Sequence, residues 1–449
     1  MEHLAHLRRH GLFDARVPRY TSYPPATAFD PSTGAAFQRN ALAEIDPSLP
    51  VSVYVHIPFC ERLCWFCACR TQGTSSLKPV EAYVQVLKQE LAMLRELLPP
   101  DVRMGQLHWG GGTPTILPPA AITNLATAIK EAITPTDDLQ FSVEIDPTMV
   151  DEAKIAALAV VGMTRASIGI QDFASDVQDA IGRQQSYEQT ARCVDMLRGA
   201  GIASLNADLV YGLPFQTPET FAETLDQVMS LTPDRLALFG YAHVPTFSKR
   251  QKLIPGHALP NEEGRFSLAK QASAAFRALG YLPIGIDHFA KPHDSLAKAA
   301  AAGRLRRNFQ GYTDDTCPSL IGVGASSISQ FDGGYVQNAA ATPAYTARIA
   351  EGQLAGHRGY AMTPEDQLRA KAINMLMCEF EIDLNALAAH PMADLLSPVH
   401  EAILQDYDGL VVREGHKLVI TPPARPLTRI IAQRYDGFSS INAQYSQAS

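Results

Sequence analysis

The sequence lacks a long uninterrupted run of hydrophobic residues. No stretch approaches the roughly 18 apolar residues that a membrane-spanning helix requires. No positively charged start is followed by an apolar segment of the kind that directs export. We therefore expect a soluble, cytoplasmic protein without membrane insertion.

An excess of positive charge is also missing. The chain carries 38 Lys and Arg against 46 Asp and Glu, a formal net charge of -8. This balance opposes the broad positive field on which non-specific nucleic-acid binding depends, so we expect no nucleic-acid partner. The sequence contains no internal repeat, and its 449 residues with 46% hydrophobic content can bury a large core.

Cysteine is scarce, but four of the seven cysteines lie within one short stretch. The cluster of Cys60, Cys64, Cys67 and Cys69 predicts a metal site in a reducing compartment rather than disulfides. The spacing Cys60-x3-Cys64-x2-Cys67 places three thiolates on one loop, which is enough to hold three irons of a [4Fe-4S] cluster and to leave the fourth iron open. Judged on the cysteines alone, a zinc site completed by Cys69 fits equally well.

From residue 51 onward, short β-rich runs alternate with longer helical runs, which predicts an α/β protein built from successive βα units. The expected strands cover residues 51–57, 106–109, 140–145, 166–170, 205–211, 236–241 and 282–286. The expected helices between them cover residues 80–98, 120–133, 187–199, 218–231 and 262–279. About seven such units fit a partial or complete parallel (β/α) barrel, and an open doubly wound sheet is the competing arrangement.

Three domains are expected along the chain. Residues 1–48 form an N-terminal arm, residues 49–350 the catalytic barrel, and residues 351–449 a mainly helical C-terminal domain. In that last domain the pattern predicts helices over 365–378 and 384–405 and a hairpin over 409–420. The combination is winged-helix-like, and a lid over the substrate is at least as plausible a role for it as any contact with DNA.

Several blocks of the sequence resemble one enzyme family. The cysteine loop with Trp65 and Phe66, the preceding strand and the later triple glycine resemble the radical S-adenosylmethionine superfamily. Within it, the chain resembles the oxygen-independent coproporphyrinogen III oxidases, also called coproporphyrinogen III dehydrogenases. The matching blocks are 18–24 (PRYTSYP), 54–69, 107–115 (LHWGGGTPT), 144–147 (EIDP), 169–173 (GIQDF), 208–214 (DLVYGLP), 241–243 (YAH), 287–289 (DHF) and 308–312 (NFQGY).

The resemblance implies the cofactors and the reaction. Cys60, Cys64 and Cys67 would ligate a [4Fe-4S] cluster whose open iron binds S-adenosyl-L-methionine, and Cys69 would not be a ligand. Reductive cleavage of that cofactor gives a 5'-deoxyadenosyl radical. The radical would start the oxidative decarboxylation of two propionates of coproporphyrinogen III to vinyl groups, giving protoporphyrinogen IX in haem biosynthesis. An unidentified electron donor and an unidentified electron acceptor are the further partners, and a monomer is the expected state.

The resemblance also implies a second S-adenosylmethionine beside the first. The residues matching the second site are Phe66, Gly112, Thr113, Gln171, Arg183 and Asp208. Those falling near one or the other cofactor are Tyr54, Gly111, Glu144, Ala242 and Ile328. Without the resemblance, Arg183 reads as a surface cation and Glu144 as a solvated residue at a strand end.

The substrate carries four propionates, so its pocket needs cations around a flat apolar macrocycle. Arg19 and Tyr20 are candidates because they lie in a block specific to this family, and Tyr23 is a further possible donor. Phe309 and Gln310 match the block that helps to close the cavity. Arg304, Arg306 and Arg307 are equally well explained as a solvated helix end.

Three other readings compete with this one. A haem-binding chaperone of the same superfamily resembles the chain in the cysteine loop, but such proteins usually lack the blocks around Arg19 and Gln310. A radical methyltransferase or a haem-opening relative would act on a tetrapyrrole with a different outcome. A structural zinc module would show no catalysis.

Overall fold

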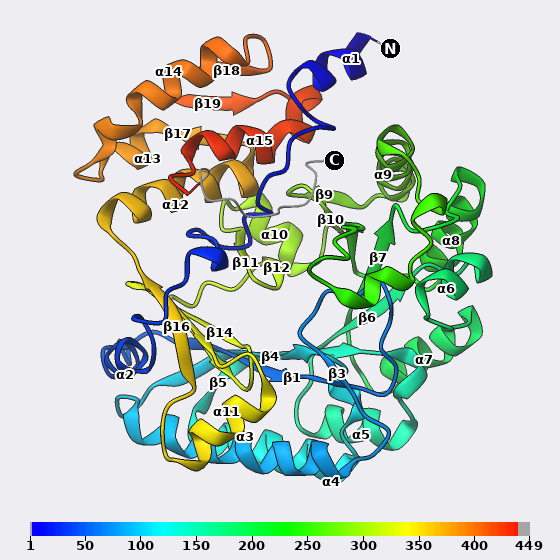
Figure 1. The fold of residues 1–449 in the computed structure, drawn as a ribbon, viewed down its shortest axis with the longest axis vertical. Helices are drawn as coiled ribbons and strands as arrows, with labels where there is room; N and C mark the ends of the chain where they lie inside the picture. The colour runs from blue at the N-terminus through cyan, green and yellow to red at the C-terminus, as the bar shows by residue number, and fades with distance from the viewer. Residues whose placement is uncertain (1, 439–449) are drawn as a thin grey trace.

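The computed structural model describes residues 2–438, and its centre is a 12-stranded sheet. Seven neighbouring strands of this sheet are parallel: β13 (Leu320–Val323), β1 (Val51–Ile57), β4 (Arg103–Gly111), β5 (Thr134–Ile145), β6 (Arg165–Gln171), β7 (Ser204–Tyr211) and β8 (Arg235–Gly240). The order runs from β16 at one edge to β9 at the other, and within residues 2–438 these edge strands do not pair with each other. The fold is therefore a partial barrel, one of the two barrel forms that the βα alternation predicts (Figure 1).

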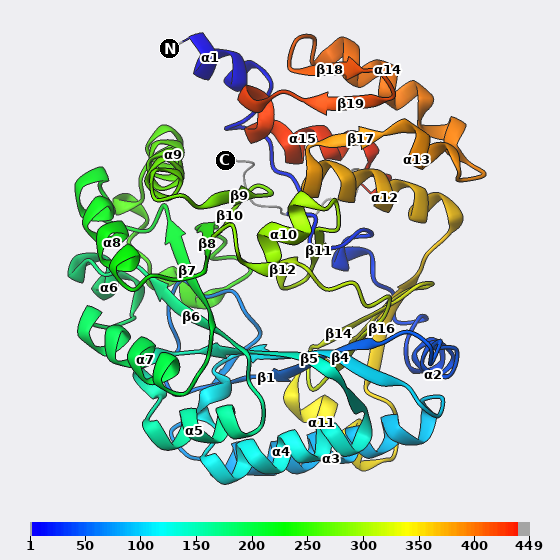
Figure 2. The same cartoon turned by 180° about the vertical axis from the view of Figure 1, so that it is seen from behind.

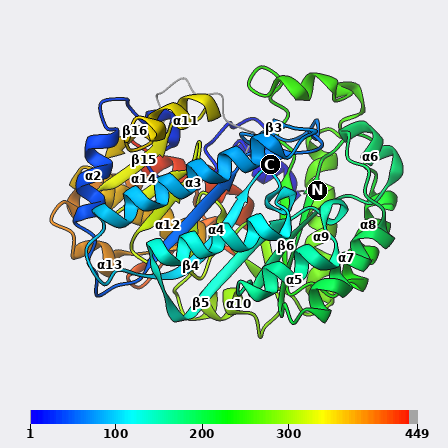
Figure 3. The same ribbon diagram turned by 90° about the horizontal axis from the view of Figure 1, so that it is seen from below.

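Helices cover the outer face of the parallel strands, as Figures 2 and 3 show. They are α3 (Lys78–Leu97), α4 (Pro119–Ala132), α5 (Glu152–Val160), α6 (Ser175–Ile181), α7 (Tyr187–Gly199), α8 (Pro218–Ser230) and α9 (Glu262–Ala278). In α3 the buried side chains Val80, Val84, Leu87, Leu91 and Leu94 recur every three or four residues, so one face packs on the sheet. Such periodicity predicted five of these helices, whereas α5 and α6 were not predicted.

The seventh predicted unit is wrong. Strand β9 (Leu282–Ile284) pairs antiparallel with β10 (His288–Ala290), and β10 pairs antiparallel with β8. Three residues separate β9 from β10, whereas a parallel connection needs a crossover of about a dozen residues or more. The chain turns at Gly285, whose φ is +56°, and so forms a hairpin at the sheet edge.

Four strands extend the other edge of the sheet beyond β1, and the sequence pattern did not predict them. They are β13 (Leu320–Val323), parallel to β1, and the antiparallel β14 (Ile328–Phe331), β15 (Gly334–Asn338) and β16 (Gly356–Ala361). The intervening elements are α10 (Ser295–Ala301), the paired β11 (Arg306–Asn308) and β12 (Gly311–Thr313), and α11 (Thr342–Ala350). Because β16 pairs with β15, the large sheet reaches Ala361, past the boundary at residue 350 expected for the barrel.

A second, smaller core lies at one end of the barrel (Figure 1). Its elements are α12 (Pro364–Glu379), α13 (Leu384–Ala388), α14 (Ser397–Asp406), α15 (Thr428–Ala432) and a sheet of β17 (Glu381–Asp383), β19 (Lys417–Ile420) and β18 (Val411–Glu414). The predicted hairpin over 409–420 is confirmed. The predicted helix over 384–405 is instead two helices, α13 and α14, because the chain leaves the helical path around Pro391.

The start of the chain belongs to this second core. Leu7, Leu12 and Phe13, which follow or lie in α1 (Glu2–Arg9), are buried against α12, α15 and neighbouring residues. Helix α2 (Ala35–Ala43) then packs beside β16 at the edge of the large sheet. The first 48 residues therefore link the two cores. None of the helices within residues 2–438 combines the length and hydrophobicity that a membrane crossing requires.

Candidate active site

The cysteine loop follows β1 and leads to α3, and it is held in place by two other segments. The backbone N–H of Trp65 donates to the Ile181 carbonyl at the end of α6, at 2.8 Å. From residues 248–251, the Gln251 amide donates to the Phe66 carbonyl at 2.8 Å and the Ser248 hydroxyl donates to the Cys67 carbonyl at 3.1 Å. The short pair β2 (Phe59–Cys60) and β3 (Gln72–Gly73) closes the base of the loop.

Each of the three spaced cysteines receives a hydrogen bond at sulfur from a different donor. The Thr113 hydroxyl donates to Cys60 Sγ at 3.5 Å, and Arg183 Nη1 donates to Cys64 Sγ at 3.5 Å. The backbone N–H of Cys69 donates to Cys67 Sγ at 3.4 Å. Hydrogen bonding to Cys69, with the charges of Arg250 and Arg183, lowers the pKa of Cys67 to about 6 even though burial opposes this shift.

This donor set fits an iron-sulfur cluster. Cluster cysteines bind separate irons and therefore need not converge on one point. All of the thiols are free, and hydrogen bonds from Thr113 and Arg183 are the kind that stabilise thiolate sulfur.

The triple glycine is packed against the protein itself. A Cβ at Gly110 would lie 2.6 Å from Glu144 Oε1, and one at Gly112 would lie 2.6 Å from the Phe59 carbonyl oxygen. The Gly111 N–H donates to Glu144 Oε2 at 3.1 Å, and His108 Nε2 lies 3.3 Å from Glu144 Oε1. The glycines thus allow β4 to approach both the cysteine loop and the Glu144 carboxylate.

Arg183 is buried beside the cysteine loop. It is therefore not the surface cation that the sequence suggests without the family resemblance. It donates to Asp146 Oδ2 at 3.3 Å, to the Gly169 carbonyl at 2.8 Å and to Gln185 Oε1 at 2.9 Å, in addition to Cys64. Burial alone would raise the pKa of Asp146, but the Arg183 guanidinium lowers it. The pair therefore stays ionised next to the thiols.

A cavity of about 220 Å³ on the inner face of the sheet brings together Glu144, Asp208 and Gln310. Asp208 accepts hydrogen bonds from Asn206 Nδ2 at 2.7 Å and from the Ser167 hydroxyl at 3.1 Å. Burial nevertheless raises the pKa of Asp208 to about 6. The carboxyl group is thus inside the protein and lines a space that a ligand can enter.

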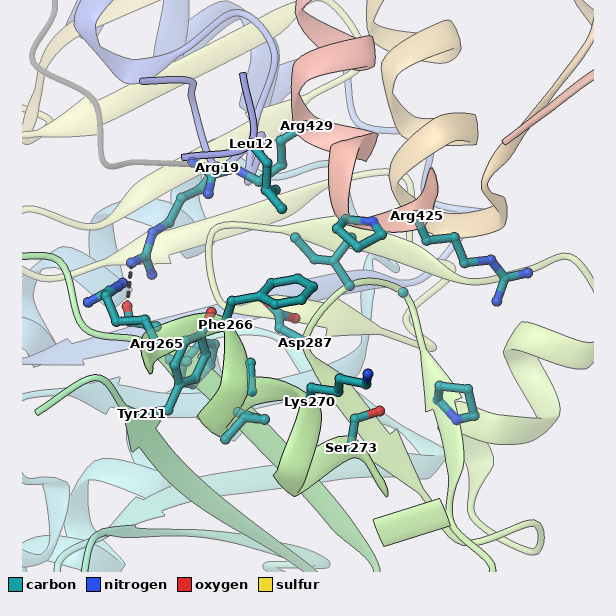
Figure 4. A pocket seen from close by; sticks show the side chains of 18 of the residues that line it. Leu12, Arg19, Tyr211, Arg265, Phe266, Lys270, Ser273, Asp287, Arg425 and Arg429 are labelled. Carbon is teal, nitrogen blue, oxygen red and sulfur yellow. Dashed lines mark hydrogen bonds between the residues drawn. The ribbon is translucent and has the colours of Figure 1, made fainter. Parts of the chain in front are cut away.

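A larger cavity of about 490 Å³ lies between β7, β8, α9, the N-terminal segment and the second core (Figure 4). Its walls include the apolar Leu12, Phe239, Phe266 and Phe289. Eight cations line it: Arg16, Arg19, Arg265, Lys270, Arg277, Arg307, Arg425 and Arg429. We call this space the cationic cavity; it shares Phe239 with the smaller cavity, and Ala242 also lines it.

Two of the predicted substrate arginines line the cationic cavity. Arg19 Nη2 donates to the Gly240 carbonyl at 2.9 Å, as Figure 4 shows. Arg307 Nη2 lies 3.7 Å from Asp287 Oδ2, while its buried Nε and Nη1 find no hydrogen-bond partner among the described residues. Burial would raise the pKa of Asp287, but Arg307 and His288 hold it well below its usual value.

Other predicted residues lie elsewhere. Tyr20 is buried in the second core, where its hydroxyl donates to Asp436 at 3.0 Å. Phe309 packs edge-on against Tyr335, with ring centroids 5.9 Å apart. Arg304 and Arg306 are exposed and do not line either cavity. Tyr54 contacts His56 and stacks on the His108 ring. Ile328 is the first residue of β14. Gln171 is the last residue of β6 and has a φ of +71°.

Sequence reasoning missed most of the cations in the cationic cavity. Arg265, Lys270 and Arg277 come from α9, and Arg425 and Arg429 come from the second core. Lys270 and Arg277 are seven residues apart, about two helical turns, which places them on nearly the same helix face. That spacing was visible in the sequence, but the cavity which the face meets was not.

Comparisons with known proteins agree with the geometry. Residues 54–228 match the family model described as the radical SAM superfamily. An oxygen-independent coproporphyrinogen III oxidase of Cereibacter sphaeroides is 57% identical, and one of Paracoccus denitrificans is 51% identical, each over 100% of both chains. The solved structure of coproporphyrinogen III oxidase from Escherichia coli, described as a radical SAM enzyme, matches with a TM-score of 0.89 and 36% identity, covering 94% of this chain and 100% of that chain.

Proposed function

Because the chain belongs to the family of oxygen-independent coproporphyrinogen III oxidases within the radical S-adenosylmethionine superfamily, we propose that it decarboxylates two propionates of coproporphyrinogen III oxidatively. Each propionate loses carbon dioxide and two hydrogens and becomes a vinyl group, so the product is protoporphyrinogen IX. When bound, a [4Fe-4S] cluster and S-adenosylmethionine supply the radical chemistry that removes the first hydrogen atom. The free thiols fit the reducing cytoplasm in which we place the reaction.

Cys60, Cys64 and Cys67 are the residues that would hold the cluster. Their sulfurs share one loop, and each receives a hydrogen bond from a different group. Cys69 contributes its backbone N–H to Cys67 Sγ, which gives it a supporting role without ligation. Leaving Cys69 out keeps one iron open, as binding of S-adenosylmethionine requires.

Polar groups on the inner face of the sheet would hold the S-adenosylmethionine molecules. Glu144 is anchored by the Gly111 N–H, so its carboxylate can accept hydrogen bonds from an amine or a ribose hydroxyl. Asp208 lines the same cavity and has acceptor capacity there. Arg183 donates hydrogen bonds to Cys64 and to Asp146, and it brings positive charge close to both proposed cofactor sites. The other residues proposed for these sites are Tyr54, Phe66, Gly111, Gly112, Thr113, Gln171, Ala242 and Ile328.

The cationic cavity is the proposed substrate site. A tetrapyrrole with four propionates offers four carboxylates around an apolar centre, and the cavity offers eight cations around apolar walls. Arginine binds carboxylates with paired hydrogen bonds, which fixes the orientation of the bound molecule. Because Gly240, Tyr241 and Ala242 at the end of β8 also line the cavity, a substrate held there lies at the same end of the barrel as the cysteine loop.

The observation that carries this function is the convergence of the three-cysteine loop and the cationic cavity on the carboxyl ends of the parallel strands. The Gln251 amide connects them directly, because it donates both to Phe66 in the loop and to Ala242 in the cavity wall, at 2.8 and 3.1 Å. The reaction also requires an electron donor that reduces the cluster and an electron acceptor.

The test is anaerobic incubation of the cluster-loaded protein with S-adenosylmethionine, a strong chemical reductant and coproporphyrinogen III. We expect tetrapyrrole masses that fall by two successive formic-acid equivalents, with matching 5'-deoxyadenosine. Cys64→Ala should abolish both the visible absorption of the cluster and product formation, whereas Cys193→Ala, a buried cysteine of α7, should retain both. Tight haem binding without these products would contradict the proposal.

A further inference from the structure

The surface that covers the cysteine loop combines exposed cations with exposed apolar side chains. We propose that it is the docking site for a small acidic protein electron carrier, with a flavin or iron-sulfur centre near its surface, that reduces the cluster. We call this surface the donor surface and define it by Arg70, Phe247, Lys249, Lys252 and Leu253. The inference rests on the proposed function, because a cluster that initiates radical chemistry must receive an electron.

Charge is the first observation that supports the donor surface. The whole chain has a formal net charge of -8, yet residues 241–260 contain Lys249, Arg250 and Lys252 without a single Asp or Glu. Lys249 and Lys252 are exposed, and Arg70 of the cysteine loop is exposed beside them. A cationic patch attracts and orients the acidic face of a partner locally, although the net charge of the whole chain is negative.

Exposed apolar side chains are the second observation. Phe247 is 69% exposed and Leu253 is 58% exposed, two of the most exposed large hydrophobic residues in the described chain. The Arg70 guanidinium lies 5.8 Å from the centre of the Phe247 ring, so the apolar and charged groups form one surface. Protein interfaces combine such an apolar centre with a charged rim.

The donor surface continues into a shallow hollow beside Leu253. Trp65 of the cysteine loop, Phe215 and Pro255 line this hollow, and Asp176 and Asp179 of α6 border it. The two carboxylates limit the cationic area on that side. An acidic carrier would therefore place its most negative part over Arg70, Lys249 and Lys252 rather than over α6.

Hydrogen bonds from residues 248–251 to the cysteine loop are the third observation. Arg250 Nη2 donates to the Cys69 carbonyl at 3.2 Å, Ser248 donates to the Cys67 carbonyl at 3.1 Å, and Gln251 donates to the Phe66 carbonyl at 2.8 Å. A carrier seated on Phe247 and Lys249 is thus separated from Cys67 by one layer of side chains and backbone. Phe247, Lys249, Lys252 and Leu253 do not line the cationic cavity, so the carrier and the substrate use different surfaces.

The step at this surface is a transfer of one electron. The reduced carrier is oxidised by one electron and the cluster is reduced by one electron, while no covalent bond forms or breaks. The carrier can then leave and another can bind, because the donor surface is on the outside of the molecule.

The experiment uses a purified flavodoxin as the acidic carrier and the cluster-loaded full chain. The test variant is K249E/K252E, and the control K88E/K298E makes the same charge change at exposed lysines of α3 and α10. Isothermal titration calorimetry at low and high salt measures binding. Bleaching of the cluster absorption measures the reduction rate with flavodoxin and, separately, with dithionite.

We expect K249E/K252E to weaken flavodoxin binding about tenfold or more at low salt, to slow reduction by flavodoxin in parallel, and to leave reduction by dithionite unchanged. K88E/K298E should behave as the unaltered chain, and high salt should weaken binding of the unaltered chain. Equal binding by both double variants, or equal loss in both, would overturn the donor surface. If K249E/K252E does not fold, Phe247→Ser and Lys252→Gln give the same comparison singly. Absence of decarboxylated product with dithionite would instead count against the proposed function.

Discussion

Arg19 lies in the family-specific block 18–24, and the structure places it in the wall of the cationic cavity, as predicted for a substrate residue. Its side chain donates to Gly240 at the end of β8 and lines the cationic cavity. Arg19 is exposed to the solvent that fills the cavity, yet desolvation by the surrounding protein lowers its pKa, with Asp287 opposing that shift. Tyr20, its neighbour, has a φ of +48° and turns into the second core instead. One residue of the same motif therefore serves the cavity and the next serves packing.

Arg19→Gln should raise the KM for coproporphyrinogen III about ten- to hundredfold, because a hydrogen bond to a charged group contributes roughly 1.5–3 kcal/mol. The cluster absorption should stay unchanged. Anaerobic steady-state kinetics provides the measurement. Arg8→Gln is the matched control, since Arg8 forms an exposed ion pair with Glu263 outside the cavity. An unchanged KM in Arg19→Gln would remove Arg19 from the proposed substrate site.

Helix α3 is tied to the far edge of the sheet through Glu90. The carboxylate accepts hydrogen bonds from the Gly324 N–H at 2.7 Å, the Asn338 amide at 2.8 Å and the Tyr345 hydroxyl at 2.6 Å. Glu90 is 1% exposed, and burial raises its pKa to about 7. One side chain thus joins α3 to the β13–β14 loop, to β15 and to α11. The apolar periodicity of α3 gave no sign of these partners.

The raised pKa of Glu90 predicts a pH dependence of stability. Between its ordinary pKa near 4.5 and about 7, the folded chain retains a proton that the unfolded chain has lost. The free energy of unfolding should therefore fall as pH rises through this window, by an amount of order 3 kcal/mol. Denaturant unfolding at pH 5 and pH 8 should show this fall in the unaltered chain and a smaller one in Glu90→Gln. Glu96→Gln, exposed on the same helix, should leave the fall intact; an identical profile in Glu90→Gln would contradict the assignment.

At the scale of the whole molecule, the first 23 residues join the second core to the barrel. Leu12, Arg16 and Arg19 line the cationic cavity, while Leu7 and Phe13 are buried against the C-terminal helices. Arg429 of α15 donates to the Pro18 carbonyl at 3.1 Å. The cavity exists only because these segments and α9 meet there, so its shape depends on both cores.

Phe13→Ala should destabilise the second core by about 3–5 kcal/mol, because Phe13 is 1% exposed and its ring packs edge-on against Phe266 in the cavity wall. The KM for coproporphyrinogen III should rise as well, while the cluster absorption persists. Denaturant unfolding followed by circular dichroism measures the loss. Phe247→Ala, at a ring that is 69% exposed, should change stability by less than about 0.5 kcal/mol. Equal stabilities for the two variants would show that the N-terminal segment is dispensable.

The sequence by itself determined the features that depend on short-range spacing. Three cysteines within eight residues must share a loop, apolar residues at helical spacing define α3, and alternating elements require a parallel sheet. The family resemblance identified the cofactors and the substrate class, which the comparisons support.

Only the tertiary structure decided what distant segments do together. It turned the seventh unit into a hairpin, buried Arg183 beside Cys64, moved Tyr20 into the second core and gathered eight cations around one cavity. These outcomes depend on contacts between residues separated by up to several hundred positions. Local propensity carries no information about such contacts, because burial and the charge of a neighbour are set by the segments that meet in the folded chain.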